Sequence, residues 1–296
     1  MISSVEDFCN IHKKKAKKLK RVFSFPKNKP RAQKVNRAFK NSLIQGCYEI
    51  LKYFKEQSLA ERLPYKSTVI FEEVWNDPEA LLKDKFCFRG VDGNLQRNDE
   101  GDIIWDDFGP EGDIEWAYYV NRHFYLREML KKFKSTNEEK YARYLEDFLR
   151  DWILNNPPPR IFYVKTTQWR VLEAGLRILV VWVELFYETL HVEHFSDYTS
   201  LLMLHSIYQH LRYLRYWPAR HGNHLIMEMD SLATGCVAFP ELKKSKKWLK
   251  KALKRMETEI TKKQVYPDGV QNELTAHYHE VALHHFEHFA KLLKNR

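Results

Sequence analysis

The sequence has few of the features that mark disulfide-linked, metal-binding, membrane-spanning or exported proteins. Its 296 residues include only 4 cysteines, far apart and without a CxxC or similar metal-ligand spacing, so we expect free thiols. No apolar run approaches the roughly 18 residues of a membrane span, and residues 1–15 lack the apolar stretch of a signal peptide. These absences predict a protein without a membrane span that is cytoplasmic, or periplasmic if its N-terminus has been trimmed.

Glycine is also scarce, at 10 residues, and alternation of Val, Ile and Thr with polar residues is rare, which argues against a sheet-rich fold. Helical periodicity dominates from Ser42 onward. We expect helices over 41–64, 116–134, 137–155, 168–190, 196–216, 222–236, 242–264 and 272–294. Asn137 is suited to cap the third of these helices.

Two segments break this pattern. Residues 1–40 are basic and interrupted by prolines, which indicates one helix followed by a loose connection. Residues 65–115 contain short apolar runs between Gly, Asn and Asp turns, which indicate strands or extended chain. The short connections elsewhere favour antiparallel helical hairpins in series, as in an α/α toroid or an α-solenoid. No repeat of fixed length is present, which argues against a regular solenoid.

The chain carries a formal net charge of +10, concentrated in Lys13 to Lys20 and in Lys243 to Lys254. A basic surface attracts polyanions such as acidic glycans, anionic lipid or nucleic acid, although runs of this kind are often only solvated helix faces. Aromatic residues make up 14% of the chain. They are suited either to fill a helical core or to stack on sugar rings.

Three polar and aromatic islands stand out, at 115–123, 220–225 and 268–279. In the second, Asn223 and His224 follow a glycine at the expected start of a helix. They are interpreted equally well as a helix cap beside an incidental histidine or as a neutral donor pair that binds a carboxylate. In the third, Tyr278 is flanked by histidines. HExxH is absent and no Asp or Cys completes a ligand set, so we expect no metal site.

The order of several motifs resembles the N-terminal α/α toroid domain of the heparinase II/III family of polysaccharide lyases. The matching segments are FRG (88–90), WDDFGPEGDIEW (105–116), NR (121–122), DWILNNPP (151–158), TQWRVLEAGLR (167–177), NHL (223–225) and DGVQNELTAHYH (268–279). One departure lies at Leu274 and Thr275, where the family more often has a polar serine. The resemblance implies an all-α fold, an incomplete toroid over 85–296 preceded by a basic helical segment over 1–84.

This resemblance implies cleavage of a uronic-acid-containing glycan by β-elimination. Asn223 and His224 are then expected to neutralise the carboxylate, and Tyr278 to act as general base or acid. The residues expected to bind substrate are Trp116, Asn121, Arg122, Trp169, Arg220, Glu273 and His279. The two tryptophans are equally suited to the core.

In this family a β-sandwich domain follows the toroid and supplies another catalytic histidine and, in some members, a structural metal. We therefore expect an acidic polysaccharide and that domain in cis as partners, and no cofactor in the toroid itself. Two alternatives stay open: a glycoside hydrolase using acids among Asp106, Asp107, Asp113 and Glu115, or a binding module without catalysis for acidic glycans. Nucleic acid is the less favoured polyanion, and the sequence does not specify the polymer.

Overall fold

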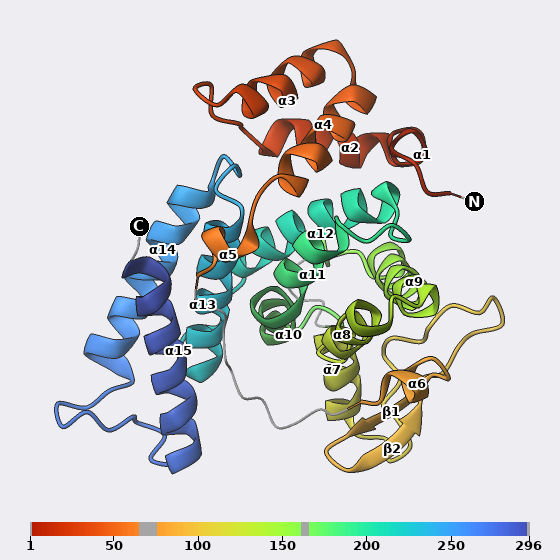
Figure 1. Ribbon diagram of the computed structural model, residues 1–296. Coiled ribbons are helices and arrows are strands. Elements are labelled where there is room, and N and C mark those ends of the chain that lie inside the picture. The colour runs from red at the N-terminus through yellow and green to blue at the C-terminus, as the bar shows by residue number, and fades with distance from the viewer. Residues whose placement is uncertain (1, 65–75, 161–165, 295–296) are drawn as a thin grey trace.

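Helices make up nearly all the regular structure of the computed structural model, which describes residues 2–64, 76–160 and 166–294 (Figure 1). The elements run in this order: α1 (Val5–Ile11), α2 (Lys13–Val22), α3 (Pro30–Asn41), α4 (Leu43–Lys55), α5 (Leu59–Arg62), α6 (Pro78–Leu81), β1 (Lys85–Phe88), β2 (Val91–Asn94), α7 (Ile114–Arg122), α8 (Leu126–Thr136), α9 (Glu139–Asn155), α10 (Val171–Leu176), the π-helix η1 (Arg177–Trp182), α11 (Val183–Thr189), α12 (Asp197–Tyr216), α13 (Asn223–Ala238), α14 (Ser245–Thr258), the π-helix η2 (Glu259–Lys263) and α15 (Ala276–Lys294). None of the helices in the described ranges is long and apolar enough to cross a membrane.

The expectation for residues 1–40 was wrong, because this segment forms three helices. Ser4 and Asp7 form a capping box that starts α1. Pro30 opens α3 at the position where its missing N–H costs nothing. Ser42 then caps α4 through the Gln45 amide. The prolines were interpreted as breaks, whereas Pro30 marks the beginning of a helix.

The expected extended segment is confirmed in part as one antiparallel hairpin of β1 and β2, with Phe86 opposite Gly93. An isolated bridge between Arg97 and Ile103 follows it. The run STVIFEEV at 67–74 lies outside the described residues.

Several expected helices are divided by features that apolar periodicity does not show. The helix expected over 116–134 breaks at His123, which adopts a left-handed conformation with φ 63°. Asn137 also lies in this conformation and ends α8, so the expectation that it caps α9 was wrong. The helix expected over 41–64 is replaced by the shorter α4 and α5. The helices expected over 168–190 and 242–264 are interrupted by the π-helical turns η1 and η2. The helices expected over 196–216 and 222–236 are confirmed as α12 and α13.

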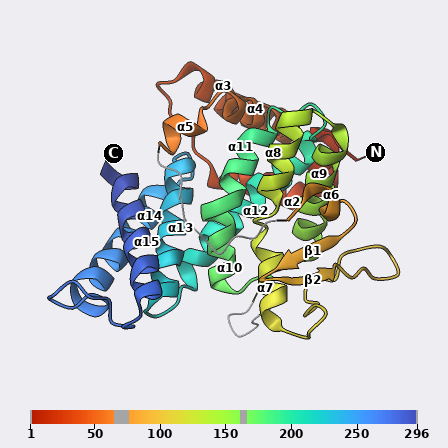
Figure 2. The ribbon, with the colours of Figure 1, turned by 60° about the horizontal axis from the view of Figure 1, so that its bottom comes forward.

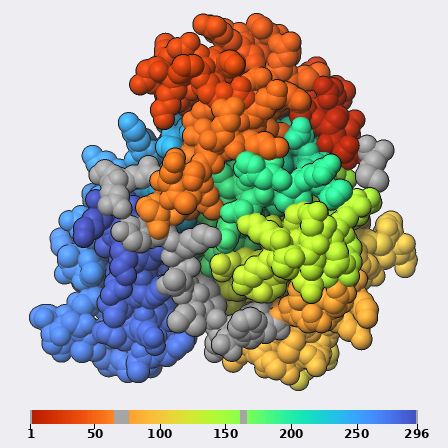
Figure 3. Space-filling view, viewed as in Figure 1, coloured from red at the N-terminus to blue at the C-terminus, as the bar shows by residue number. Residues whose placement is uncertain are grey.

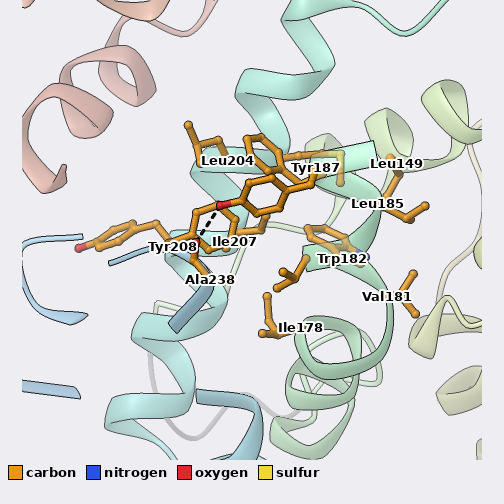
Figure 4. Packing of buried hydrophobic residues seen from close by; sticks show 14 of the residues in the cluster. Leu149, Ile178, Val181, Trp182, Leu185, Tyr187, Leu204, Ile207, Tyr208 and Ala238 are labelled. Carbon is orange, nitrogen blue, oxygen red and sulfur yellow. Dashed lines mark hydrogen bonds between the residues drawn. The ribbon is translucent and has the colours of Figure 1, made fainter. Parts of the chain in front are cut away.

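One hydrophobic core runs from Val5 to Leu292. Figure 4 shows part of it, where Trp182 and Tyr187 lie near Ile207 and the Tyr187 hydroxyl donates to the Ala238 carbonyl at 2.7 Å. A charged group also lies in this core: the fully buried Arg177 guanidinium is centred 4.3 Å from the Trp152 ring.

The helices follow one another around a ring, from α7–α9 through α10–α12 to α13–α15 (Figures 1 and 2). The N-terminal helices α1–α4 lie across one end of this ring, at the top of Figure 3. They are attached by a Tyr198 N–H bond to the Ser3 carbonyl and by a bridge between Phe23 and Leu242. The expected boundary at residue 84 stays a prediction.

A buried ion pair ties α5 to the end of α13. Arg62 donates to both carboxylate oxygens of Glu241, at 2.7 and 2.9 Å, and to the Ala238 carbonyl, while Tyr53 donates to the same carboxylate. We expect Arg62→Leu to lower the free energy of unfolding by about 3 kcal/mol, because it leaves the Glu241 carboxylate buried without its cation. The double variant Arg62→Leu, Glu241→Leu should recover part of the loss in urea unfolding. A double variant as unstable as Arg62→Leu would contradict this.

Candidate active site

A cavity of about 470 Å³ opens between α7, α10, α13 and α15. It is lined by Tyr119, Arg122, Leu172, Leu176, Asn223, His224, Met227, His277, Tyr278, Glu280, Val281, His284 and His285. The structure thus brings Asn223, His224, Tyr278 and Arg122 to the lining of one cavity, although Tyr278 is more than fifty residues from Asn223 and His224 in the chain.

The amide of Asn223 has a defined orientation. Gly222, with φ 85°, precedes α13, so Asn223 is the first helical residue rather than the cap. The Glu273 N–H donates to Gln271 Oε1, and Gln271 Nε2 therefore serves as donor to Asn223 Oδ1 at 3.2 Å. Asn223 Nδ2 is buried and has no hydrogen-bond partner within the described part of the chain. The cavity wall thus offers an unused N–H donor.

The charges around this donor are compensated. The buried carboxylate of Glu173 accepts from Arg122 Nε at 2.9 Å and from Arg170 Nη1 at 2.7 Å. The Arg122 guanidinium also lies 4.3 Å from the Tyr119 ring centre. Burial and then the positive charge of Arg170 lower the pKa of His224, so its neutral form dominates at pH 7. A neutral ring still carries one N–H donor.

Tyr278 lies in the first turn of α15, with 46% of its surface exposed. Its backbone N–H is capped by Thr275 Oγ1 at 3.2 Å. Glu273 was expected in the first turn but lies before the helix, next to Leu274 at φ 57°. His279 Nδ1 accepts from the Gln271 N–H at 3.3 Å. Gln271 therefore connects the start of α15 to Asn223.

A second set of polar contacts joins α13 to α15 about two helical turns beyond Asn223 and was not predicted from the sequence. We call it the Asp230 layer. Asp230 is fully buried, and its two oxygens accept from His285 Nδ1 at 2.9 Å and His288 Nδ1 at 2.7 Å. Asp230 follows Asn223 by seven residues, and His285 follows Tyr278 by seven, so each pair shares a helix face. Asn223, at the start of α13, is linked through Gln271 to the start of α15, and Asp230, farther along α13, is bonded to residues farther along α15. The two helices therefore run in the same direction.

The sequence contained a weak signal for this layer. His284, His285 and His288 follow Tyr278 closely in the sequence, and the structure pairs His285 with His288 through an aspartate on another helix. No cluster of three or more potential metal ligands occurs among the residues that the structure describes.

Several residues expected to bind substrate lie elsewhere. Asn121 is fully buried; its Nδ2 donates to the Trp105 and Ala117 carbonyls and its Oδ1 accepts from Trp152 Nε1. Trp169 is only 2% exposed and donates to the Asn156 carbonyl. These contacts give both residues a structural role and leave Asn121 no unused N–H for a ligand.

The remaining candidates also lie outside the lining of the 470 Å³ cavity. Trp116 is buried beside Gly93 and Gly109, at a separate hollow lined also by Asp113 and Glu115. Arg220 is exposed in the connection between α12 and α13, where its carbonyl accepts from Arg255. Glu273 and His279 lie around the entry to α15 and are not among the residues that line the 470 Å³ cavity.

Successive helices arranged around a cavity are typical of an α/α toroid, and comparison with known proteins assigns the family. The family model for the heparinase II/III N-terminus matches residues 25–296, so the chain belongs to the heparinase II/III family. The resemblance inferred from the motifs is therefore confirmed.

Relatives of known name agree with this assignment. A heparin-sulfate lyase from Pedobacter heparinus is 33% identical over 184 residues, covering 62% of this chain and 27% of that protein. Another from Bacteroides stercoris is 28% identical over 237 residues, covering 75% of this chain and 35% of that protein. The chain thus spans about a quarter to a third of the length of these relatives.

The fold is matched by solved structures. A crystal structure of heparinase III superposes with a TM-score of 0.76 at 21% identity, covering 91% of this chain and 42% of that one. The heparan sulfate lyase HepC from Pedobacter heparinus gives a TM-score of 0.70 at 24% identity, covering 92% and 43%. The expected all-α toroid is confirmed.

The Asp230 layer should make stability dependent on acid pH. Burial raises the pKa of Asp230, but the hydrogen bonds from His285 and His288 outweigh it, and the net pKa lies below the usual value. Stability from this carboxylate is therefore complete above about pH 4 and is lost as the pH falls further. We expect Asp230→Asn to cost about 2 kcal/mol at neutral pH and the difference from wild type to shrink on acidification, in urea unfolding.

Asp151 provides a matched control of opposite sign. Burial raises the pKa of Asp151, which accepts from Trp105 Nε1 at 2.6 Å. The difference between wild type and Asp151→Asn should therefore not shrink as the pH falls. The same acid dependence in both variants would contradict the role given to Asp230.

Proposed function

We propose that the protein is a polysaccharide lyase, or the toroid of one, that cleaves a glycosaminoglycan of the heparan sulfate class by β-elimination. The observation that carries the proposal is the unused amide donor of Asn223, which lines the same cavity as Tyr278. The names of the heparin-sulfate lyase relatives support the substrate class.

The reaction requires donors of this kind. A base removes the proton on C5 of the uronate, the C–H electron pair forms the C4=C5 double bond, and the bond from C4 to the bridging oxygen breaks. Negative charge develops on the C6 carboxylate as the proton leaves. Donors fixed in advance stabilise that charge without reorganising, and removal of one costs about 3 kcal/mol in comparable sites.

The side chains of the cavity fit these requirements. Asn223 Nδ2 and the neutral ring of His224 are the proposed donors to the carboxylate. Tyr278, partly exposed at the cavity wall, is the proposed group that takes the C5 proton or protonates the leaving oxygen. Arg122 donates to Glu173. We propose that Arg122 contributes to the electrostatic potential of the cavity and does not bind the substrate acid bidentately.

The cleft is proposed to be completed in cis. The relatives extend well beyond the part that this chain matches, and a following β-sandwich domain would supply a second wall and a histidine. We propose that the toroid itself uses no cofactor.

Tyr278→Phe tests the proton-transfer role. In the full-length protein we expect turnover of heparan sulfate to fall by at least about 100-fold, because the hydroxyl is lost, while binding of the glycan is retained. Turnover is followed by the ultraviolet absorbance of the conjugated enoate product, and binding by titration. His277→Ala, beside it on the same turn, is the matched control and should lose much less. Retained turnover in Tyr278→Phe would contradict the role, and absence of the enoate product in wild type would overturn the proposed reaction.

Gln271 is proposed as a positioning residue for the Asn223 amide. Asn223→Ala should lower kcat by about 100-fold or more, as for other preorganised donors. Gln271→Met keeps the side-chain length but frees the amide, so we expect a smaller fall in kcat, about tenfold, with little change in KM. The control Gln264→Met removes a neighbouring buried amide that is bonded to Glu259 and does not line the cavity. An effect of Gln271→Met on KM alone would indicate substrate binding instead.

A further inference from the structure

A continuous row of basic side chains runs over α2, α12 and α14 toward the cavity. We call Lys18, Arg212, Lys244, Lys247, Lys251 and Arg255 the basic track. Lys244 directly precedes α14, and Lys247, Lys251 and Arg255 follow at spacings of three, four and four residues, so the four share one helix face. From Lys244 to Arg255 they extend over about 17 Å, at about 1.5 Å per residue.

Specific contacts bring the three helices together. Lys18 Nζ lies 5.5 Å from the ring centre of Tyr208, and that ring stacks on Trp248 of α14. The Lys243 N–H donates to the Val22 carbonyl at 3.0 Å, which joins the end of α2 to the chain entering α14. Figure 1 shows this segment, in light blue, near the N-terminal helices.

The far end of the track is bonded to the connection that leads into α13. Lys251 Nζ donates to the Arg215 carbonyl at 3.2 Å, and Arg255 Nη2 donates to the Arg220 carbonyl at 2.7 Å. Arg220 lies three residues before Asn223 in the connection that opens α13. A polymer bound at Asn223 could therefore continue onto α14.

In the part of the chain that the structure describes, the side chains of the track form no ion pairs with carboxylates. Within residues 2–64, 76–160 and 166–294, no carboxylate forms an ion pair with Lys18, Arg212, Lys244, Lys247, Lys251 or Arg255. The neighbouring positive charges also contribute, after burial, to a lowered pKa of Lys18. This differs from the cavity, where Glu173 pairs with Arg122 and Arg170 and Glu115 lies 3.9 Å from Arg122. A row of like charges without ion-paired carboxylates attracts a linear polyanion.

We propose that the basic track is a second binding site, outside the cleft, for the sulfated or carboxylated chain whose next segment occupies the cavity. The assignment to a glycan rests on the proposed function, on the charge of the track and on its hydrogen bonds to the connection that precedes Asn223. The track would hold long chains and contribute little to short ones.

The test uses the triple variant Arg212→Gln, Lys244→Gln, Lys247→Gln in full-length protein that also carries Tyr278→Phe to prevent cleavage. All three side chains are exposed, so folding should be preserved. Lys83→Gln, Lys85→Gln, Lys132→Gln removes the same charge around β1 and α8, on the opposite side of Figure 1, and is the matched control. The probes are long heparan sulfate, a heparan sulfate tetrasaccharide and duplex DNA.

We expect the track variant to bind long heparan sulfate about tenfold more weakly, with unchanged tetrasaccharide binding and an unchanged control variant. The slope of log K against log salt should also fall by about 2, at about 0.7 for each contact to a flexible polyanion. Equal weakening in both triple variants would overturn the track, since net charge alone would explain it. Tighter, track-dependent binding of DNA would overturn the glycan assignment.

The outcome separates the two proposals. Track-dependent glycan binding without any enoate product from wild type would support the track and overturn the lyase. Enoate formation with glycan binding that ignores the track residues would support the lyase and overturn the track.

Discussion

The buried carboxylate of Asp230 is the contact on which the geometry of the cavity depends. It joins α13 to α15 by accepting from two histidines of one helix, in a place where an uncompensated charge would be strongly unfavourable. Because α13 and α15 run in the same direction, fixing Asp230 against His285 also fixes the residues seven positions earlier on each helix. Asn223 and Tyr278 are those residues. The contacts of Asp230, about two helical turns farther along, therefore set the distance between the proposed donor and the proposed proton-transfer group.

The periodic part of the fold could be predicted from the sequence, and its interruptions could not. The apolar stripes of α12 and α13 depend on spacing alone, which is local information. His123, Asn137 and Leu274 adopt left-handed backbone conformations without being glycine, and tertiary contacts stabilise such conformations. His123, for example, accepts from Trp182 Nε1 at 3.0 Å, from a residue 59 positions away. No local pattern encodes that partner.

The candidate site shows the same division. The order of motifs identified Asn223, His224 and Tyr278, and the structure places them in the lining of one cavity. The order of motifs could not separate residues that bind a ligand from those that support the fold, because both kinds are polar or aromatic and occur in the same motifs. Asn121 belongs to the second kind, since two carbonyls and an indole N–H occupy its amide. Asp230 was not predicted from the sequence, because its role depends on hydrogen bonds from histidines that lie 55 and 58 residues later in the chain.

The distribution of charge suggests a division of work between the cavity and the basic track. Interactions that are equally strong before and during the reaction lower KM without raising kcat, whereas those that strengthen in the transition state accelerate it. The side chains of the track are cationic whatever the state of the reaction, so they would contribute to holding the chain. In the cavity, Glu173 and Glu115 pair with the arginines, and the proposed donors are a neutral amide and a neutral imidazole. Neutral donors interact more strongly as charge accumulates on the carboxylate, so a cavity with compensated arginines favours the transition state over the bound substrate.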